Sequence, residues 1–323
     1  MAQITFTLLL LTAKAHASLR CIELFEEDIT AKITNARQSV ESYNQPNGRT
    51  LTAIGNSLGA EAIAAIENLK KGALVIDSGS GFSIAGIELA LKGIRVIAIN
   101  AQNAWEFFAN QVNSEAFSPK FKRIISLAID ELKITIEGTR LKKKFNGTSY
   151  YYDIDAASAK DLKILGQRLL QKLNSLHQKG LFNYFVGFSD LLLRHTSQEA
   201  DLLLDHWGAL FYSPNRTLLL DAYYSNLKIG GIAFMRIKGA EGEGVNDTVT
   251  IGRGRASYQM SLVDYLVQKY PNNFEKLNGG RTLKMIRTKD VENLGLQELL
   301  KAVTQTVERF DGGEYPGVVW QLN

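Results

Sequence analysis

The sequence predicts an α/β fold with a mostly parallel sheet, an antiparallel C-terminal hairpin strand and a largely helical insertion. Short continuous apolar runs alternate with helical patterns in two blocks, residues 72–100 and 182–290. Such alternation is typical of buried parallel strands that are joined by helices. Near the end of the second block, two apolar runs flank the segment NGG at 278–280. This arrangement indicates a hairpin, so the last strand of the sheet is expected to be antiparallel.

The composition is that of an ordinary globular protein, with 323 residues of which 45% are hydrophobic and 22% are charged. The formal charge of +4 is small and the charges are interleaved, so no general polyanion-binding surface is implied. We interpret the basic clusters at 120–123 and 142–144 as solvated faces. The single cysteine, Cys21, excludes an internal disulfide framework and a multi-cysteine zinc site, and no metal site is expected.

The N-terminus has the pattern of a signal peptide. An apolar stretch from Ile4 to Ala13 is followed by Ala15-His16-Ala17, and cleavage there would leave Ser18 first. A buried N-terminal strand or helix is the alternative interpretation. Export or a periplasmic location follows if the signal is real, and a cytoplasmic location follows otherwise. No apolar stretch reaches the roughly 20 residues that a membrane-spanning helix needs, so no transmembrane segment is expected in the mature chain.

The pattern divides the chain into four regions. They are a signal peptide over 1–17, an N-terminal helical region over 18–71, a main domain over 72–290, and a C-terminal helix and tail over 291–323. The insertion covers about 101–180 of the main domain, where mainly helical patterns interrupt the β-α alternation.

Helices and strands are expected in a defined order. Helices are expected over 23–43 and 60–69, followed by a β-α-β unit made of a strand over 73–76, a helix over 84–91 and a strand over 94–99. After the insertion, strands are expected over 184–187, 200–205 and 231–237, with a helix over 217–227 between the last two. A helix over 260–270, the hairpin around 278–280 and a last helix over 294–310 complete the chain.

The segment ALVIDSGSGFSIAGIELALKG and the following IRVIAIN resemble motif I and the next strand of class I S-adenosylmethionine-dependent methyltransferases. Asp77, Gly79 and Gly81 match the family pattern as they stand. The resemblance implies a Rossmann-like fold that binds S-adenosylmethionine, with Asp77 near the amino-acid end of the cofactor. Glycines at this turn let the backbone approach a ligand closely. Ser83 stands where many members have a third glycine, and Gly86 comes later.

Two further positions bear on the cofactor. A dinucleotide fingerprint that starts at Gly79 needs glycine at position 84, but Ile84 stands there, so that interpretation fails. At the end of the second strand the family usually carries an acidic residue for the ribose hydroxyls, whereas this chain has Asn100. An amide can make a similar hydrogen bond without the charge.

The second block also resembles these methyltransferases. VGFSDLLLRH corresponds to the third family strand and its loop, which makes Asp190, beside Ser189, the candidate for the adenine; an exposed loop residue is the alternative. The segment from ADLLLDHWGALF to KIGGIAFM resembles the fourth strand, its helix and a Lys-x-Gly-Gly turn into the fifth strand. The turn residues are Lys228, Gly230 and Gly231.

Asp205 and His206 are the candidate catalytic residues, because they end the fourth strand beside the expected position of the methyl group; Asp205 is also a cofactor candidate. Methyl transfer mainly requires that the enzyme align the acceptor with the methyl group of the cofactor. A base is needed only where the acceptor must lose a proton. His206 is a candidate for that base, and a packed histidine is the alternative. The segment DHWGALF lacks the Asn/Asp-Pro-Pro-aromatic motif with which amino-methylating DNA enzymes hold the exocyclic amine of a base. Cys21 lies outside both blocks, so a cysteine nucleophile, as in enzymes that methylate a pyrimidine carbon, is not expected either. We therefore expect a small-molecule or protein acceptor rather than nucleic acid.

A non-catalytic Rossmann-like binding or interaction protein derived from a methyltransferase is the competing hypothesis. Ser83 and Asn100 favour it, whereas Asp77, the two glycines and the Lys228 turn favour a working enzyme. The tyrosines at 150–152 in the insertion either line a substrate pocket or form a packed cluster. The sequence specifies neither the acceptor nor the oligomeric state.

Overall fold

The computed structural model describes residues 50–114, 129, 143–145, 148–150, 159–213, 215–239, 244–252, 256–310 and 313–322. The expected signal peptide over 1–17 and the expected helix over 23–43 lie outside these residues. Across the described ranges, no helix combines the length and the apolar character needed to cross a membrane.

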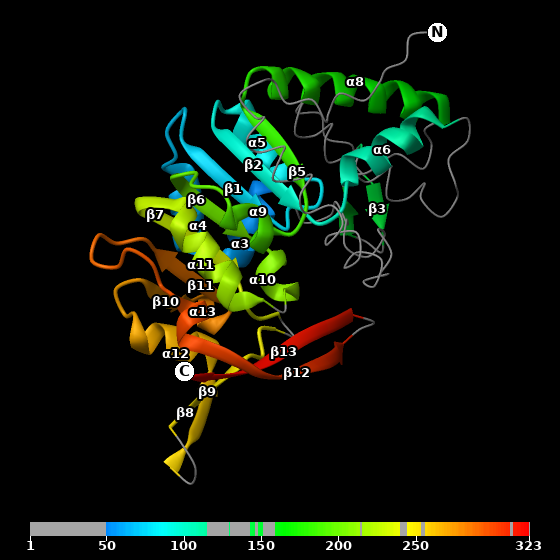
Figure 1. Ribbon diagram of the computed structural model, residues 1–323. Coiled ribbons are helices and arrows are strands. Elements are labelled where there is room, and N and C mark those ends of the chain that lie inside the picture. The colour runs from blue at the N-terminus through cyan, green and yellow to red at the C-terminus, as the bar shows by residue number, and fades with distance from the viewer. Residues whose placement is uncertain are drawn as a thin grey trace.

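A seven-stranded sheet with the order β10-β11-β7-β6-β1-β2-β5 forms the centre of the protein (Figure 1). Its strands are β1 (Leu74–Ser78), β2 (Arg95–Asn100), β5 (Phe182–Val186), β6 (Ala200–Asp205), β7 (Leu227–Arg236), β10 (Phe274–Leu277) and β11 (Thr282–Ile286). β5, β2, β1, β6 and β7 pair in parallel, whereas β11 is antiparallel to β7 and to β10. The predicted Rossmann-like, mostly parallel sheet with an antiparallel C-terminal hairpin is confirmed.

Helices cover both faces of this sheet (Figure 1). The first face carries α3 (Leu51–Leu58), α4 (Ala60–Glu67), α5 (Ile84–Leu91), α6 (Ala104–Asn113) and α8 (Ala159–Gln178). The second carries α9 (Ser189–Arg194), α10 (Ala209–Tyr212), α11 (Arg216–Asn226), α12 (Leu262–Lys269) and α13 (Leu296–Leu299). Side chains of β1 alternate between the two cores, with Val75 in the first and Leu74 and Ile76 in the second. All three are buried, which explains the continuous apolar run in the sequence.

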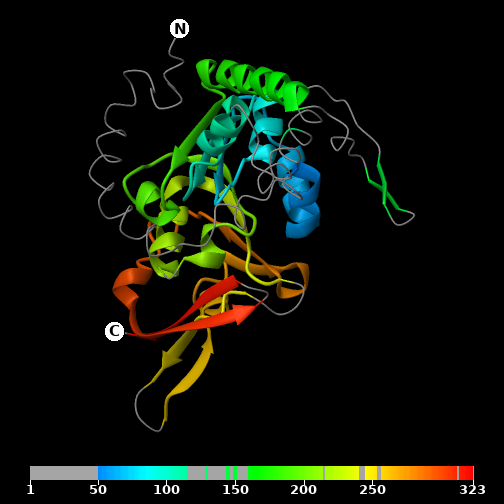
Figure 2. The same ribbon diagram turned by 90° about the vertical axis from the view of Figure 1, so that its right-hand side faces the viewer.

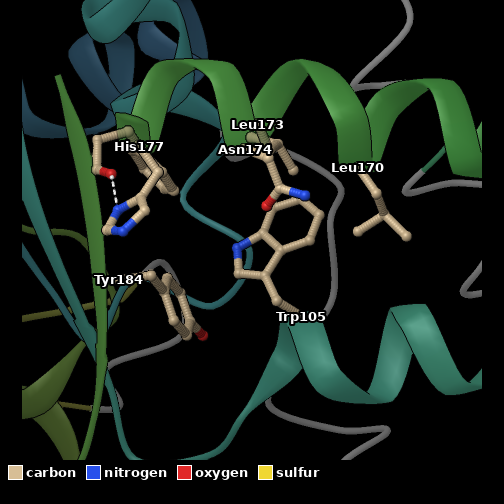
Figure 3. Close-up of a pocket in the computed structure, with 7 residues that line it drawn as sticks. Trp105, Leu170, Leu173, Asn174, His177 and Tyr184 are labelled. Carbon is tan, nitrogen blue, oxygen red and sulfur yellow. Dashed lines mark hydrogen bonds between the residues drawn. The ribbon is translucent and has the colours of Figure 1, made fainter. Parts of the chain in front are cut away.

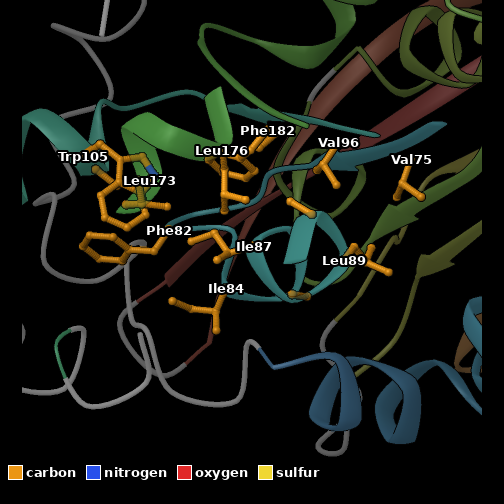
Figure 4. Packing of buried hydrophobic residues seen from close by; sticks show 14 of the residues in the cluster. Val75, Phe82, Ile84, Ile87, Leu89, Val96, Trp105, Leu173, Leu176 and Phe182 are labelled. Carbon is orange, nitrogen blue, oxygen red and sulfur yellow. The ribbon is translucent and has the colours of Figure 1, made fainter. Parts of the chain in front are cut away.

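The first core continues past the sheet into an aromatic group (Figure 4). Phe82, from the turn after β1, and Trp105 of α6 pack edge to face with ring centroids 5.3 Å apart. Phe108 contacts both rings in the same manner. This packing fixes the start of α6 against the turn, so the insertion is anchored beside the carboxyl ends of β1 and β2.

The insertion lies between β2 and β5, which are neighbours in the sheet, so it leaves the strand order intact. Its described elements are α6, the strands β3 (Lys143–Phe145) and β4 (Thr148–Tyr150), and α8. The β3-β4 hairpin extends away from the sheet (Figure 2). Tyr150 belongs to β4, whereas Tyr151 and Tyr152 lie outside the described residues.

The predicted C-terminal helix over 294–310 is wrong beyond residue 299. α13 ends at Leu299, and β12 (Leu300–Phe310) then pairs antiparallel with β13 (Gly313–Leu322). β13 lies parallel to β8 (Thr248–Ile251), which pairs with β9 (Tyr258–Ser261), so a second sheet has the order β12-β13-β8-β9. Because β9 extends to Ser261, the helix expected from residue 260 begins only at Leu262, as α12. The β-branched run in VTQTV suits a strand, and pairing with distant residues overrides the helical spacing.

Candidate functional site

The carboxyl ends of β1, β2 and β6 meet at one edge of the sheet. Asp77 is in register with Ala98 of β2 and with Leu204 of β6. Asn100 and Asp205 therefore lie at the same edge as Asp77, and the chain changes direction in the sheet between β1 and β6. Such a switch point leaves a crevice outside the strand ends, where open α/β sheets bind ligands.

The turn after β1 is fastened to the end of β2. Gly79 and Gly81 have φ values of 65° and 55°, in the left-handed region that favours glycine. The backbone N–H of Gly81 donates to Oδ1 of Asn100 at 3.2 Å, and the N–H of Ser80 donates to the carbonyl of Ile99 at 3.0 Å. Asn100 thus holds the turn, which is a local role that the sequence did not reveal.

Asp77 is 4% exposed and contacts the residue that replaces the third glycine of the family pattern. The hydroxyl of Ser83 donates to Oδ2 of Asp77 at 2.5 Å. Ser83 has a φ of 51°, so the left-handed conformation expected of a glycine is kept. A Cβ on Gly86 would lie 2.2 Å from Oγ of Ser83 and 3.0 Å from Cγ1 of Val96. Gly86 therefore provides the room that the Ser83 hydroxyl and the packing of α5 on β2 require.

The turn after β1 also touches the loop after β6. A Cβ on Gly79 would lie 2.2 Å from Cα of Gly208, and a Cβ on Gly208 would lie 2.2 Å from the carbonyl oxygen of Ser78. Neither position accepts a side chain unless the backbones separate. The two glycines therefore set the distance between the two loops.

We expect Gly79→Ala to lower the free energy of unfolding by more than Gly230→Ala. Gly230 has a φ of 80° but open space around it, so alanine there costs only the backbone strain of about 1–2 kcal/mol. Alanine at position 79 adds an overlap with the Gly208 backbone, which costs about 1–3 kcal/mol more. Urea unfolding of both variants measures the difference. Equal losses would contradict the contact between the loops.

Asp205 lies at the end of β6 and is fully buried. Its carboxylate accepts hydrogen bonds from the backbone N–H groups of Gly208 at 2.9 Å and Leu210 at 2.8 Å, and from the hydroxyl of Tyr223 at 2.5 Å. Burial raises the pKa of Asp205 to about 6, although these hydrogen bonds oppose the shift. Both carboxylate oxygens hold the loop after β6 in place.

His206 and Trp207 continue the chain at this edge. His206 is 8% exposed, and Trp207 is half-buried with a φ of 55°, which is uncommon for a residue with a large side chain. The Trp207 ring contacts Phe211, with centroids 4.8 Å apart, and the guanidinium of Arg236 lies 5.4 Å from the ring centroid. These contacts hold the side chain in place while the backbone of Trp207 keeps its unfavourable left-handed conformation, and such backbone strain clusters at functional sites.

Asp190 lies in the first turn of α9 and is buried rather than exposed. Its Oδ1 accepts a hydrogen bond from the N–H of Leu191 at 3.0 Å, and its Oδ2 accepts one from Asn215 at 3.4 Å. The neighbouring Ser189 hydroxyl lies 2.7 Å from that of Ser78. The end of β5 is thereby connected to the end of β1.

Lys228, Gly230 and Gly231 lead from α11 into β7, the fifth parallel strand, as predicted. They lie within β7, at the opposite edge of the sheet from Asp205. Lys228 pairs with Asp201 at the start of β6, and a Cβ on Gly231 would lie 2.5 Å from the carbonyl oxygen of Ala200. The register of β6 and β7 shifts at this point. This segment therefore serves the pairing of β6 and β7 and lies away from the candidate site.

Two tyrosines at the site were missed by sequence reasoning. The hydroxyl of Tyr184 in β5 donates to the carbonyl of Gly81 at 2.7 Å, and burial raises its pKa. Tyr223 of α11 contacts Asp205 and lies among buried apolar residues. The sequence offers only a weak signal for them, because each tyrosine stands within an otherwise apolar segment. The hydroxyl of a tyrosine buried in such a segment needs a hydrogen-bond partner.

A small cavity of about 20 Å³ lies between α6, α8 and β5 (Figure 3). It is lined by Trp105, Leu170, Leu173, Asn174, His177, Phe182 and Tyr184. Among the described residues, Nε1 of Trp105 has no hydrogen-bond partner. The volume holds about one water molecule. Because the Tyr184 hydroxyl bonds to Gly81, this side chain stands between the cavity and the turn after β1.

No family model and no curated protein sequence matches the chain. Among solved structures, it is similar to the Burkholderia thailandensis 1,6-didemethyltoxoflavin-N1-methyltransferase with bound 1,6-didemethyltoxoflavin and S-adenosylhomocysteine. That similarity has 10% identity and a TM-score of 0.29, over 95% of this chain and 88% of the enzyme.

Two further similarities involve enzymes that act on ribosomal RNA. An rRNA methylase from Streptococcus thermophilus is 11% identical over 78% of this chain and 88% of its own, with a TM-score of 0.28. The T. thermophilus 16S rRNA N2 G1207 methyltransferase, in complex with S-adenosylmethionine and guanosine, is 11% identical with a TM-score of 0.30. The match covers 78% of this chain and 44% of that one. TM-scores this low do not define the fold, which the strand order defines instead.

Proposed function

We propose that the chain binds S-adenosylmethionine at the carboxyl edge of β1 and β2 and transfers its methyl group to a small-molecule or protein acceptor. The observation that carries this proposal is the convergence of Asp77, the left-handed glycine turn and Asn100 at the switch point of the sheet. A carboxylate suits the ammonium of the cofactor's amino-acid end, and an amide suits ribose hydroxyls.

The residues present at this edge fit such a cofactor. The hydroxyl of Ser80, in the centre of the glycine turn, is buried and has no hydrogen-bond partner among the described residues. A buried hydroxyl left unsatisfied costs about 1–3 kcal/mol, so a polar ligand atom at this turn would offset a cost that the fold carries without it. The carboxylate of Asp77 lies at the same turn, where it accepts a hydrogen bond from the hydroxyl of Ser83.

When bound, the cofactor supplies a methyl group on a positively charged sulfur, which an acceptor attacks in line. The contribution of the chain is to align the two molecules and to exclude water. The burial of Asp205 and its three donors favour a positioning role over proton abstraction. His206 follows it directly and is the candidate base for an acceptor that must lose a proton. Trp207 is the half-buried aromatic surface beside it.

A non-catalytic binding or interaction protein that no longer binds S-adenosylmethionine is the second candidate, and the Ser83–Asp77 hydrogen bond favours it. This bond engages the carboxylate at the position where the family resemblance places the cofactor's amino-acid end. A protein that had lost its ligand would be free to satisfy Asp77 internally in this way.

Calorimetric titration of the full chain with S-adenosylmethionine and S-adenosylhomocysteine tests the proposal. We expect dissociation constants in the micromolar range, about 8 kcal/mol of binding free energy, and no binding of NADH, because Ile84 replaces a required glycine. A chain that binds neither S-adenosyl compound would support the non-catalytic candidate. If NADH bound instead, the cofactor assignment would be wrong.

A further inference from the structure

Tyr223 connects segments that are far apart in the sequence. Its hydroxyl lies 2.5 Å from Oγ of Ser78, directly after Asp77, and donates to Oδ2 of Asp205 at 2.5 Å. Oγ of Ser78 lies 2.7 Å from Oγ of Ser189. A continuous path of hydrogen bonds therefore runs from α9 through the end of β1 and α11 to the end of β6.

Every side chain on this path is buried, so its geometry is narrowly defined. Ser78, Ser189, Asp205 and Tyr223 are all nearly inaccessible to solvent. Buried polar groups that satisfy one another rigidify their surroundings, because any displacement leaves a group unsatisfied. Tyr223 projects from α11, whose buried residues belong to the second core, so its hydroxyl is held by a packed helix rather than by a loop.

We infer that Tyr223 is a positioning residue for the proposed cofactor site, because its hydroxyl fixes the turn after β1 and the loop after β6 relative to each other. The inference rests on the proposed function. Asp205 transmits the effect, since its carboxylate holds the amides of Gly208 and Leu210. Gly208 is the residue that touches the turn at Gly79.

The charges around the path agree with this role. Burial, followed by the Asp205 charge, raises the pKa of Tyr223, so the phenol keeps the proton that it donates. Burial also raises the pKa of Asp205, and the Tyr223 hydrogen bond lowers it again. Among the described residues, the charge of Asp77 raises the pKa of Asp205, and the charge of Asp190 raises that of Tyr223.

Tyr223→Phe tests the inference, and Tyr224→Phe is its matched control. Tyr224 is equally buried on the same helix, but its hydroxyl donates to the carbonyl of Val291 at 2.7 Å, away from the site. We expect the affinity for S-adenosylhomocysteine to fall about tenfold in Tyr223→Phe and to stay within twofold in Tyr224→Phe. Affinity should decline below pH 6 in the wild type, as Asp205 gains a proton, and this midpoint should move to higher pH in Tyr223→Phe.

Amide hydrogen exchange without ligand gives a readout that is independent of the proposed function. We expect the amides of Gly208 and Leu210 to exchange at least tenfold faster in Tyr223→Phe than in Tyr224→Phe. Equal exchange in the two variants would overturn the inference, as would wild-type affinity and an unshifted pH midpoint in Tyr223→Phe. If the wild type bound no ligand, both the proposed function and the role of Tyr223 at a cofactor site would be overturned. Amide hydrogen exchange would still decide whether Tyr223 couples the turn after β1 to the loop after β6.

Discussion

Replacing Asp77 with alanine is expected to weaken binding of S-adenosylmethionine and S-adenosylhomocysteine by about 10- to 100-fold. A hydrogen bond to a charged group contributes about 1.5–3 kcal/mol, and Asp77 is the acidic residue at the end of β1 where the cofactor's ammonium group is expected. The side chain is buried beside Ser83, so its removal is not compensated by water from an open surface. Calorimetric titration of the variant against the wild type measures the effect.

Asp77→Asn separates the charge from the shape. Asparagine keeps an oxygen that can accept the hydrogen bond of Ser83, but it has no charge to offer an ammonium. Its affinity should lie between those of the wild type and Asp77→Ala, while its thermal unfolding stays close to that of the wild type. If both variants bound as tightly as the wild type, Asp77 would have no role in cofactor binding.

Replacing Arg216 with methionine is expected to lower the free energy of unfolding by about 3–5 kcal/mol. Arg216 and Asp247 form an ion pair in which both side chains are 0% exposed, and losing one partner of a buried pair strands the other charge in a medium of low polarity. Arg216 also donates to the carbonyls of Leu210 at 2.8 Å and Phe211 at 2.9 Å. Urea unfolding monitored by circular dichroism measures the loss.

The exposed ion pair between Lys276 and Asp264 provides the control. Its side chains are 41% and 48% exposed, so Lys276→Met should change the free energy of unfolding by less than about 1 kcal/mol. A loss in Arg216→Met as small as that in Lys276→Met would mean that the buried pair does not stabilise the fold.

The Arg216 cluster also explains how the C-terminal sheet is attached. Nε1 of Trp320 in β13 donates to Oδ2 of Asp247 at 2.8 Å, while Arg216 holds the carbonyls of α10 directly after the site. The second sheet is therefore joined through one buried charge pair to the helix that follows His206 and Trp207.

The elements that the sequence predicted well are those determined by local pattern. The helix over 84–91 and the strand over 200–205 have the predicted bounds, because glycines at 81 and 93 mark the ends of the helix and a continuous apolar run marks the buried strand. The helical spacing within β12 misleads because its partner, β13, is only evident once the chain has folded. Strand formation depends on such pairing, so single-segment patterns mislead there.

The site divides in the same way. Asp77, Gly79, Gly81 and Asn100 lie within one β-α-β unit, and their convergence could be predicted from the motif. The contact of Tyr223 with the site could not be predicted, because its partner Ser78 is 145 positions away and no local pattern marks the contact. The Lys228 motif marks the entry into the fifth parallel strand, as predicted, but that entry lies at the opposite end of the strands from Asp205 and so says nothing about the site.

Mapping amide chemical shifts of the isotope-labelled chain during titration with S-adenosylhomocysteine tests the central claim most directly. The cofactor site proposed here predicts saturable shifts at Gly79, Ser80, Gly81 and Asn100, with little change at Gly279, in the hairpin turn between β10 and β11. Shifts confined to the cavity beside Trp105 and His177, or no saturable shifts at any position, would contradict a cofactor site at the carboxyl edge of β1 and β2.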